Sequence, residues 1–264
     1  MTTQDYAAPA AELSSGPMPL LGFGTWQIEN SGATSATEHA LEAGYRHIDT
    51  ATAYGNEAGI GKALAASDLP RESIFVTTKL PPERAGRERP TLEQSLSKLG
   101  LDYVDLWLIH WPPNGQASPQ VWSQLIQARS DGLAKAIGVS NYSLRQIDEL
   151  VSATGETPAV DQIRWGPPLY DPAVANGLAE RGVVLEGYSP FKVTNLKDKR
   201  LASIAEAHDA TAAQVIVAWH VAHGFVVIPK SVRHERIVAN AAGAKIELTP
   251  DEVAAIDGMS AAAG

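Results

Sequence analysis

The sequence predicts a single (β/α)8 barrel, the TIM-barrel class of α/β fold, preceded by a short N-terminal β-hairpin. Short apolar runs alternate with helix-length amphipathic segments along all 264 residues, and eight such runs occur. Strict alternation of strand and helix indicates a parallel sheet that is covered on both faces. Eight units favour a closed barrel over an open sheet, and a barrel of roughly 250 residues folds as one domain. We therefore expect one domain over residues 1–264, of which residues 1–11 form a flexible tail.

The expected elements follow the chain in regular order. Residues 12–20 contain the turn-forming sequence Ser14-Ser15-Gly16-Pro17, which indicates a hairpin that plugs the barrel floor. The apolar runs predict strands at residues 21–24, 47–49, 74–79, 104–110, 134–140, 159–163, 183–188 and 225–228. The amphipathic segments predict helices at residues 34–43, 58–66, 91–99, 119–131, 144–153, 172–181, 200–208, 212–222, 235–241 and 250–256.

The composition limits the classes of partner. The net charge is −9 at pH 7, which disfavours nucleic acid because binding a polyanion needs a basic surface. No cysteine is present, so disulfides, thiolate catalysis and cysteine metal sites are excluded. We see no signal-peptide pattern and no apolar run that approaches the roughly 20 residues of a membrane span. We expect a cytoplasmic monomer without membrane or metal, in which His220 and His223, lacking a third ligand, are surface residues.

Reactive side chains follow three consecutive strands. Asp49 ends the second expected strand, Lys79 ends the third and His110 ends the fourth, while Tyr54 follows Asp49 in the next loop. In a barrel of this class the active site lies at the carboxyl ends of the strands. Any one of these residues alone would more often cap a helix, pack or be solvated. All four at one rim indicate an active site.

These four residue types suit the reduction of a carbonyl group. Addition of hydride to the carbonyl carbon places negative charge on the oxygen, which needs a proton donor and a polar clamp. Tyr54 is the candidate general acid, and a nearby Lys79 ammonium would lower the phenol pKa from its ordinary value of about 10. Asp49 would keep Lys79 charged. His110 would hydrogen-bond and orient the substrate oxygen.

Five motifs, in chain order, extend this interpretation to nearly the whole chain. They are LGFGTW at 21–26, GYRHIDTA at 44–51 with YGNE at 54–57, LGLDYVDL at 99–106 with IHWP at 109–112, IGVSNY at 137–142 and IPKS at 228–231. In these motifs the sequence resembles the aldo-keto reductase superfamily, and in particular its bacterial short-loop members similar to diketogluconate and aldehyde reductases. The resemblance implies a small-molecule carbonyl substrate, NADPH (NADP+) as the cofactor, and a catalytic tetrad of Asp49, Tyr54, Lys79 and His110.

The resemblance also implies that the cofactor is held without a Rossmann fold. Gly22-Phe23-Gly24 agrees with this, because it lacks the third glycine of a dinucleotide fingerprint. By resemblance, Tyr188 would stack on the nicotinamide ring, and the backbone from Ser189 to Phe191 would cover the pyrophosphate. The side chains that would hydrogen-bond the nicotinamide carboxamide are Ser140, Asn141 and Gln162. Further contacts of the cofactor are implied for Gly24, Thr25, Trp26, Val232 and Asn240.

A basic cluster is present in this acidic chain. It consists of Lys230, Ser231, Arg233 and Arg236, which follow the last expected strand and open a helix. A helix start with basic side chains is a ready anion site. The resemblance assigns this site to the 2′-phosphate of NADPH, and a solvated basic turn is the alternative. We therefore expect NADPH to bind more tightly than NADH.

Three departures from the family pattern concern the pocket. Ala239 stands where a glutamate near the adenine is common, and Leu80-Pro81-Pro82 stands in place of a tryptophan–asparagine pair. The loop after Pro113 is short, and no long C-terminal segment is expected to narrow the pocket. With Trp26 and Trp111 as apolar pocket walls, we expect a range of small carbonyl substrates, selected by fit. The main challenge to this expectation is that three loop cations could select acidic substrates, namely Arg84, Arg87 and Arg89.

Two other functions stay open at this point. The barrel could bind NADPH without turnover, as a redox-responsive partner subunit, although the intact tetrad argues against it. Lys79 could instead form a Schiff base, as in a barrel isomerase or aldolase. That chemistry needs a lysine free of a carboxylate partner, and Asp49 is expected to be such a partner.

Overall fold

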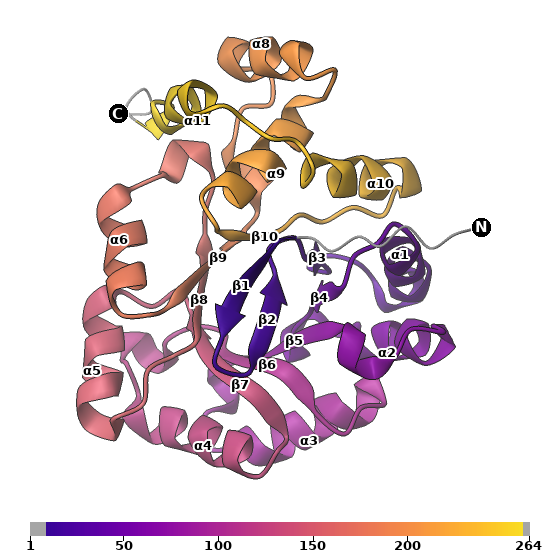
Figure 1. The fold of residues 1–264 in the computed structure, drawn as a ribbon. Helices are drawn as coiled ribbons and strands as arrows, with labels where there is room; N and C mark the ends of the chain where they lie inside the picture. The colour runs from indigo at the N-terminus through magenta and orange to yellow at the C-terminus, as the bar shows by residue number, and fades with distance from the viewer. Residues whose placement is uncertain (1–8, 261–264) are drawn as a thin grey trace.

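Eight parallel strands form the central sheet of residues 9–260, the part of the chain that the computed structural model describes (Figure 1). The sheet closes where the Gly22 N–H donates to the Val227 carbonyl over 2.9 Å and the Val227 N–H donates to the Leu20 carbonyl over 2.7 Å. The predicted (β/α)8 barrel is confirmed. Its strands, in order around the sheet, are β3 (Phe23–Gly24), β4 (His47–Asp49), β5 (Phe75–Leu80), β6 (Val104–Ile109), β7 (Ala134–Ser140), β8 (Val160–Arg164), β9 (Val184–Tyr188) and β10 (Val226–Ile228).

The first strand is shorter than the expected residues 21–24. Only Phe23 and Gly24 pair with β4, whereas Leu21 forms an isolated bridge with Val227. The start of this segment therefore pairs with β10 and its end pairs with β4. This change of neighbour is what joins the two edges of the sheet.

Helices connect the strands and surround the barrel (Figure 1). Between successive strands lie α1 (Asn30–Glu42), α2 (Glu57–Ala66), α3 (Glu88–Leu99), α4 (Pro119–Ser130), α5 (Leu144–Thr154) and α6 (Pro172–Glu180). The chain between β9 and β10 contains α7 (Pro190–Val193), α8 (Lys199–Ala207) and α9 (Ala212–Ala222), and α10 (His234–Gly243) and α11 (Pro250–Asp257) follow β10. Across residues 9–260, no helix combines the length and the apolar character that crossing a bilayer would need.

Capping boxes fix the starts of three helices. In each, a Ser or Thr oxygen accepts the N–H of the residue three positions later, whose Gln or Glu side chain accepts the N–H of the capping residue. The pairs are Ser143 with Gln146, Thr211 with Gln214 and Thr249 with Glu252. Because these caps satisfy N–H groups that the helix leaves open, α5, α9 and α11 begin at the residues that the sequence predicted.

An antiparallel hairpin, β1 (Ala10–Leu13) with β2 (Gly16–Pro19), covers one end of the barrel (Figure 1). Met18 is fully buried in a cluster with Phe75, Val160 and Val226, the first residues of β5, β8 and β10. The hairpin therefore plugs the amino-terminal floor, as predicted. It starts at Ala10, inside the expected tail, because Ala10 pairs with Pro19, and the Leu20 N–H donates to the Pro9 carbonyl just beyond that pair. Residues 1–8 of that tail lie outside the described residues.

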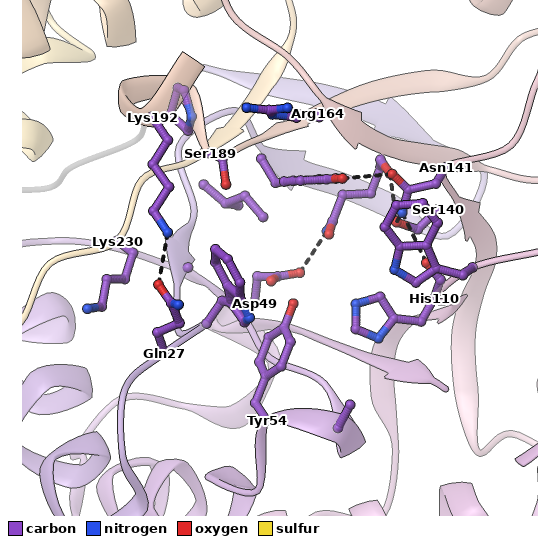
Figure 2. A pocket seen from close by; sticks show the side chains of 18 of the residues that line it. Gln27, Asp49, Tyr54, His110, Ser140, Asn141, Arg164, Ser189, Lys192 and Lys230 are labelled. Atoms are coloured by element: carbon purple, nitrogen blue, oxygen red, sulfur yellow. Dashed lines mark hydrogen bonds between the residues drawn. The ribbon is translucent and has the colours of Figure 1, made fainter. Parts of the chain in front are cut away.

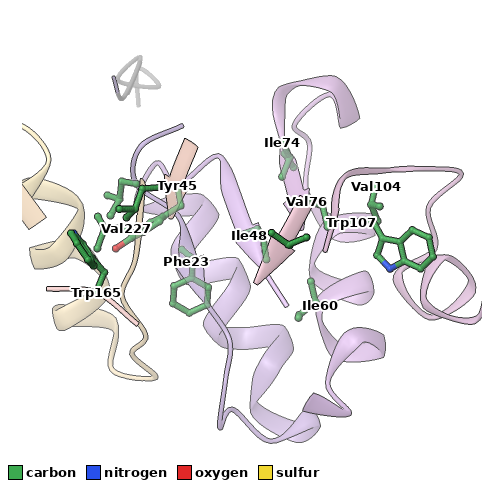
Figure 3. Close-up of a cluster of buried hydrophobic side chains, with 14 of the residues drawn as sticks. Phe23, Tyr45, Ile48, Ile60, Ile74, Val76, Val104, Trp107, Trp165 and Val227 are labelled. Carbon is green, nitrogen blue, oxygen red and sulfur yellow. The ribbon is translucent and has the colours of Figure 1, made fainter. Parts of the chain in front are cut away.

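The larger apolar core lies between the strands and the helices. Figure 3 shows part of it, where Ile48 of β4 and Val76 of β5 lie near Ile60 of α2. All three side chains are fully buried. Because successive side chains of a strand face opposite sides, the residues next to Ile48 and Val76 face the barrel interior. This alternation directs Asp49 and Lys79 inward.

Candidate active site

A cavity of about 540 Å³ opens at the carboxyl ends of the barrel strands (Figure 2). Three residues of the predicted tetrad, Asp49, Tyr54 and His110, line it. The fourth, Lys79, is fully buried against Asp49. Other predicted site residues in the wall are Gly24, Trp26, Trp111, Ser140, Asn141, Gln162, Tyr188, Ser189, Phe191 and Lys230.

Lys79 and Asp49 form a buried ion pair. Lys79 Nζ lies 2.7 Å from each carboxylate oxygen of Asp49 and donates to the Thr50 carbonyl over 2.8 Å. Gln162 Nε2 also donates to Asp49 Oδ2, over 2.8 Å. Burial is the largest single influence on the pKa of Lys79 and lowers it, but the negative charges around the ammonium, that of Asp49 first, together with the hydrogen bond to Asp49 raise this pKa above its ordinary value. Lys79 is therefore an ammonium ion at neutral pH, held by three acceptors.

A short turn after β4 positions Tyr54. Thr52–Tyr54 forms a 3-10 turn that ends at Gly55, whose φ of +69° lies in the left-handed region that favours glycine. Asn56 is fully buried, accepts a hydrogen bond from Thr50 Oγ1 and donates to two carbonyls of the loop after β3. Asn56 thus joins two loops at the pocket. This role was not predicted from the sequence, although the motif at 54–57 contains the residue.

Tyr54 lies close enough to Lys79 for the ammonium to act on the phenol. Lys79 Nζ is 5.2 Å from the centre of the Tyr54 ring. Burial raises the pKa of Tyr54, the Lys79 charge lowers it, and burial has the larger effect. The lowering by Lys79 that the sequence predicted is present but is outweighed. Tyr54 therefore keeps its proton at neutral pH, the state that a proton donor needs.

His110 faces Tyr54 across the pocket. The two ring centres are 5.6 Å apart, and the rings meet edge to face at 74°. His110 follows β6 rather than ending it, and its backbone N–H donates to the Leu80 carbonyl. Burial and the Lys79 charge lower the pKa of His110 to about 3. The ring is therefore neutral and can donate one hydrogen bond.

Polar side chains beside His110 form a connected wall (Figure 2). The Tyr188 hydroxyl donates to Asn141 Oδ1 over 2.8 Å, and Asn141 Nδ2 donates to the His110 carbonyl over 3.1 Å. Ser140 Oγ donates to the Gln162 carbonyl over 2.7 Å. These side chains retain further hydrogen-bonding capacity, such as the oxygen of the Gln162 amide. A ligand that carries an amide could be held by hydrogen bonds to these free donors and acceptors.

The predicted anion site lies at the start of α10. Lys230 lines the cavity, whereas Val232, Arg233 and Arg236 are exposed and are not part of its wall. Ser231 Oγ accepts from the Arg233 N–H over 3.1 Å, which shapes the turn into the helix. Arg233, which precedes α10, also forms an ion pair with Glu235 in the first turn of that helix, so part of its charge is already compensated.

Neither Thr25 nor Asn240, which were predicted to contact the cofactor, lines the cavity. Both are buried, and Thr25 Oγ1 donates to the Asp49 carbonyl over 2.8 Å. Gly24 lines the cavity at the barrel closure, where a Cβ atom would lie only 2.5 Å from the Ile228 carbonyl oxygen. Only glycine fits at this position, which explains one of the residues in the first motif.

Comparison with known proteins identifies the family. A sequence profile of the Aldo/keto reductase family matches residues 20–261. An aldo-keto reductase of Mycolicibacterium smegmatis is 44% identical over 247 residues, which cover 92% of this chain and 87% of that protein. The chain belongs to the aldo/keto reductase family.

Two further relatives bear on this aldo/keto reductase. A protein named methylglyoxal reductase DkgA, from Salmonella typhimurium, is 40% identical over 243 residues, which cover 90% of this chain and 88% of that protein. The crystal structure of a Bombyx mori aldo-keto reductase in complex with NADP matches with a TM-score of 0.89 and 32% identity, over 96% of this chain and 92% of that one. The family that the five motifs indicated is confirmed.

Three polar residues of this aldo/keto reductase's pocket wall were not predicted from the sequence, namely Gln27, Arg164 and Lys192. Lys192 Nζ donates to Gln27 Oε1 over 2.8 Å and lies 4.1 Å from the centre of a Trp26 ring. The contact joins the loop after β3 to α7, at the edge of the pocket (Figure 2). No local pattern links residues so far apart in the sequence, so no sequence signal was present for it.

Other charged and basic residues fall outside the pocket. Arg84, Arg87 and Arg89 are exposed and stand away from the cavity wall, and Arg89 pairs with Glu93 and Asp131. The expectation that His220 and His223 are surface histidines is wrong for His220. It is fully buried, because its side chain lies on the inner face of α9 and its Nδ1 atom bonds the Ile216 carbonyl.

Proposed function

We propose that this aldo/keto reductase reduces aldehydes and ketones to alcohols with NADPH, and that Tyr54 is the general acid. The observation that carries the proposal is the position of the Tyr54 phenol between the buried Lys79–Asp49 pair and the neutral ring of His110. Tyr54 supplies a proton donor, Lys79 supplies a positive charge that stabilises the phenolate, and His110 supplies a hydrogen-bond donor. Carbonyl reduction needs these three.

The residues around the pocket fit NADPH. A cavity of about 540 Å³ has the size of an ordinary cofactor or ligand site. Tyr188 offers an aromatic face beside the amide groups of Asn141 and Gln162, which suits a ring that carries a carboxamide. Lys230 and Arg236 would supply positive charge for phosphate groups at the start of α10. When it is bound, NADPH supplies the hydride for the reduction.

The side chains of the protein control the substrate oxygen and the proton. In this mechanism, His110 donates its ring N–H to the carbonyl oxygen and orients it beside Tyr54. Tyr54 transfers its hydroxyl proton to the same oxygen as negative charge develops there. The Lys79 ammonium stabilises the resulting phenolate, and Asp49 keeps Lys79 charged although both are buried.

Consumption of NADPH by the purified protein tests the proposal. We expect turnover with small aldehydes and ketones, methylglyoxal among them. Tight NADPH binding without turnover of any carbonyl compound would instead favour a non-catalytic partner subunit. A Schiff-base mechanism is disfavoured because all three N–H groups of Lys79 have acceptors, which leaves no free amine. Borohydride with a carbonyl substrate should therefore not label Lys79.

We expect NADPH to bind about 100-fold more tightly than NADH, because each charge-assisted contact to a phosphate contributes roughly 1.5–3 kcal/mol. Changing both Lys230 and Arg236 to Ala should bring the two dissociation constants within about tenfold. Fluorescence quenching of the protein by each cofactor measures them. Arg145→Ala on α5, an exposed cation away from the cavity, is the control. Equal dissociation constants in the unaltered protein would contradict this assignment of the cluster.

We also expect modest substrate selectivity. Trp26 and Trp111 are 45% and 48% exposed and offer apolar area, which discriminates by only about 1–3 kcal/mol per methylene. The measurement compares kcat/KM for aliphatic, aromatic and carboxylate-bearing carbonyls of similar size. A preference for carboxylates above about a hundredfold would contradict the expectation. In that case Arg164→Met would show whether the arginine in the pocket wall is responsible.

A further inference from the structure

A second carboxyl group lies inside the barrel, near Asp49 and Lys79. Glu186 of β9 is fully buried, and its neighbours on the flanking strands are Gln162 of β8 and Val226 of β10. Neither carboxyl oxygen accepts a hydrogen bond of regular geometry from the described residues, although the Gln162 amide lies close enough to lower the pKa of Glu186. One oxygen lies 3.7 Å from His47 Nε2, and that ring is itself fully buried beside Thr77.

The charges around Glu186 determine its protonation. The titratable groups that act on it are Asp49 and His47 from β4 and Lys79 from β5. Burial, helped by the Lys79 charge, lowers the pKa of His47 to about 3, so this histidine is neutral. The single positive charge of Lys79 is already paired with Asp49. An ionised Glu186 would therefore be an extra buried anion, which is strongly unfavourable.

We propose that Glu186 is a positioning residue of the reduction, held as a neutral carboxylic acid so that no second buried anion opposes the action of Lys79 on Tyr54. The proposal rests on the role of Tyr54 proposed above. Burial, together with the charge of Asp49, raises the pKa of Glu186 to about 8, which agrees with the charge count. The contact between Glu186 and His47 is accordingly one between two neutral groups near neutral pH.

Ionisation of Glu186 has a definite consequence for the rate. A negative Glu186 raises the pKa of Lys79 and offsets part of the positive field that Lys79 exerts on the phenol. The phenolate that Tyr54 becomes on giving up its proton is then less stable. A change of one unit in the Tyr54 pKa corresponds to about tenfold in the equilibrium. The reduction should slow as Glu186 loses its proton.

The pH profile of kcat for NADPH-dependent reduction tests this consequence. In the unaltered protein, kcat should fall by up to about tenfold as the pH rises through about 8. Glu186→Gln keeps the shape and the neutral form of the side chain. It should therefore retain near-normal kcat at about pH 6.5 and lose the decline near pH 8. An unchanged decline in Glu186→Gln would overturn the proposal.

Asp161→Asn is the matched control. Asp161 is a buried carboxyl group on β8 whose pKa burial raises to about 7, and it accepts a hydrogen bond from the Tyr142 N–H. We expect the decline in kcat to persist in Asp161→Asn. If it disappears there and persists in Glu186→Gln, Asp161 is the titrating group and the proposal is wrong.

Thermal unfolding supplies a test that does not depend on activity. The pKa of Glu186 is raised on folding, so its contribution to stability is full below the unfolded pKa of about 4.3 and is lost as the pH rises through about 8. The melting temperature of the unaltered protein should thus fall over this range relative to that of Glu186→Gln. If the melting temperatures of the two proteins change with pH in parallel, Glu186 is not held as a neutral acid. If the protein is inactive but its melting temperature still falls with pH relative to Glu186→Gln, only the proposed function is contradicted. If the protein is an active enzyme that depends on Tyr54 and this difference in melting temperature is absent, only the inference about Glu186 is contradicted.

Discussion

Tyr54→Phe should lose about 10²–10⁴-fold in kcat for carbonyl reduction, the usual effect of removing a general acid. The phenylalanine ring preserves the edge-to-face contact with His110, whose ring centre lies 5.6 Å away, and removes only the hydroxyl group. Binding of NADPH should be nearly unchanged, because Tyr54 is not among the groups proposed to hold the cofactor. Steady-state kinetics and fluorescence titration separate the two effects.

Tyr170→Phe is a control for the loss of a tyrosine hydroxyl elsewhere in the molecule. Tyr170 packs against Trp165 and Trp219, away from the cavity wall. This variant should turn over like the unaltered protein. A Tyr54→Phe enzyme that keeps near-normal kcat on a simple aldehyde would rule out Tyr54 as the acid.

Asp49→Asn should reduce both stability and activity. The substitution leaves the Lys79 ammonium fully buried without its counter-charge, and breaking a buried ion pair in this way costs about 3–5 kcal/mol of unfolding free energy. For a domain of this size, that corresponds to a fall of roughly 10 °C in Tm. Lys79 should lose its proton more easily, so the phenolate of Tyr54 loses its support and kcat falls.

The double variant Asp49→Asn, Lys79→Met distinguishes the two effects. Removing both charges should recover much of the lost stability, because no unpaired charge remains. Activity should stay low, since no cation is left beside Tyr54. Calorimetry gives Tm for the two single variants and the double variant. A strictly additive loss of stability would contradict the coupling between the two side chains.

The sequence predicted those parts of the molecule that depend on local pattern. Strand ends placed Asp49 and Lys79 correctly at one rim, because parallel strands carry their carboxyl ends to the same side. Strand boundaries shifted by a residue or two, because pairing with a neighbour decides them, and α1 and α3 begin four and three residues before the expected starts at 34 and 91. His110, for example, lies just beyond β6 rather than at its end.

Features that arise from contacts between distant segments were not predictable from pattern. Lys192 meets Gln27 only because the loop after β3 and the helical turn after β9 lie at the same end of a closed barrel. The burial of Tyr54 outweighs the effect of Lys79 on the phenol pKa, and burial is a property of the folded chain. In the sequence, Glu186 is one residue of an apolar strand. Its role was not predictable because the charged residues near it come from the separate strands β4 and β5.

The closure of the barrel has a consequence for how the protein is made. The joining hydrogen bonds link Leu20 and Gly22 to Val227, segments from nearly opposite ends of the chain. Because the two segments are so far apart in the sequence, their contact has a large entropic cost of loop closure. During synthesis this contact cannot form before β10 has left the ribosome. Gly24 and Lys230, which flank the join, also line the cavity. Asp49, Tyr54, Lys79 and His110 are therefore synthesised well before the pocket is complete. The nascent chain can bind a cofactor only after the last strand, β10, has joined the barrel.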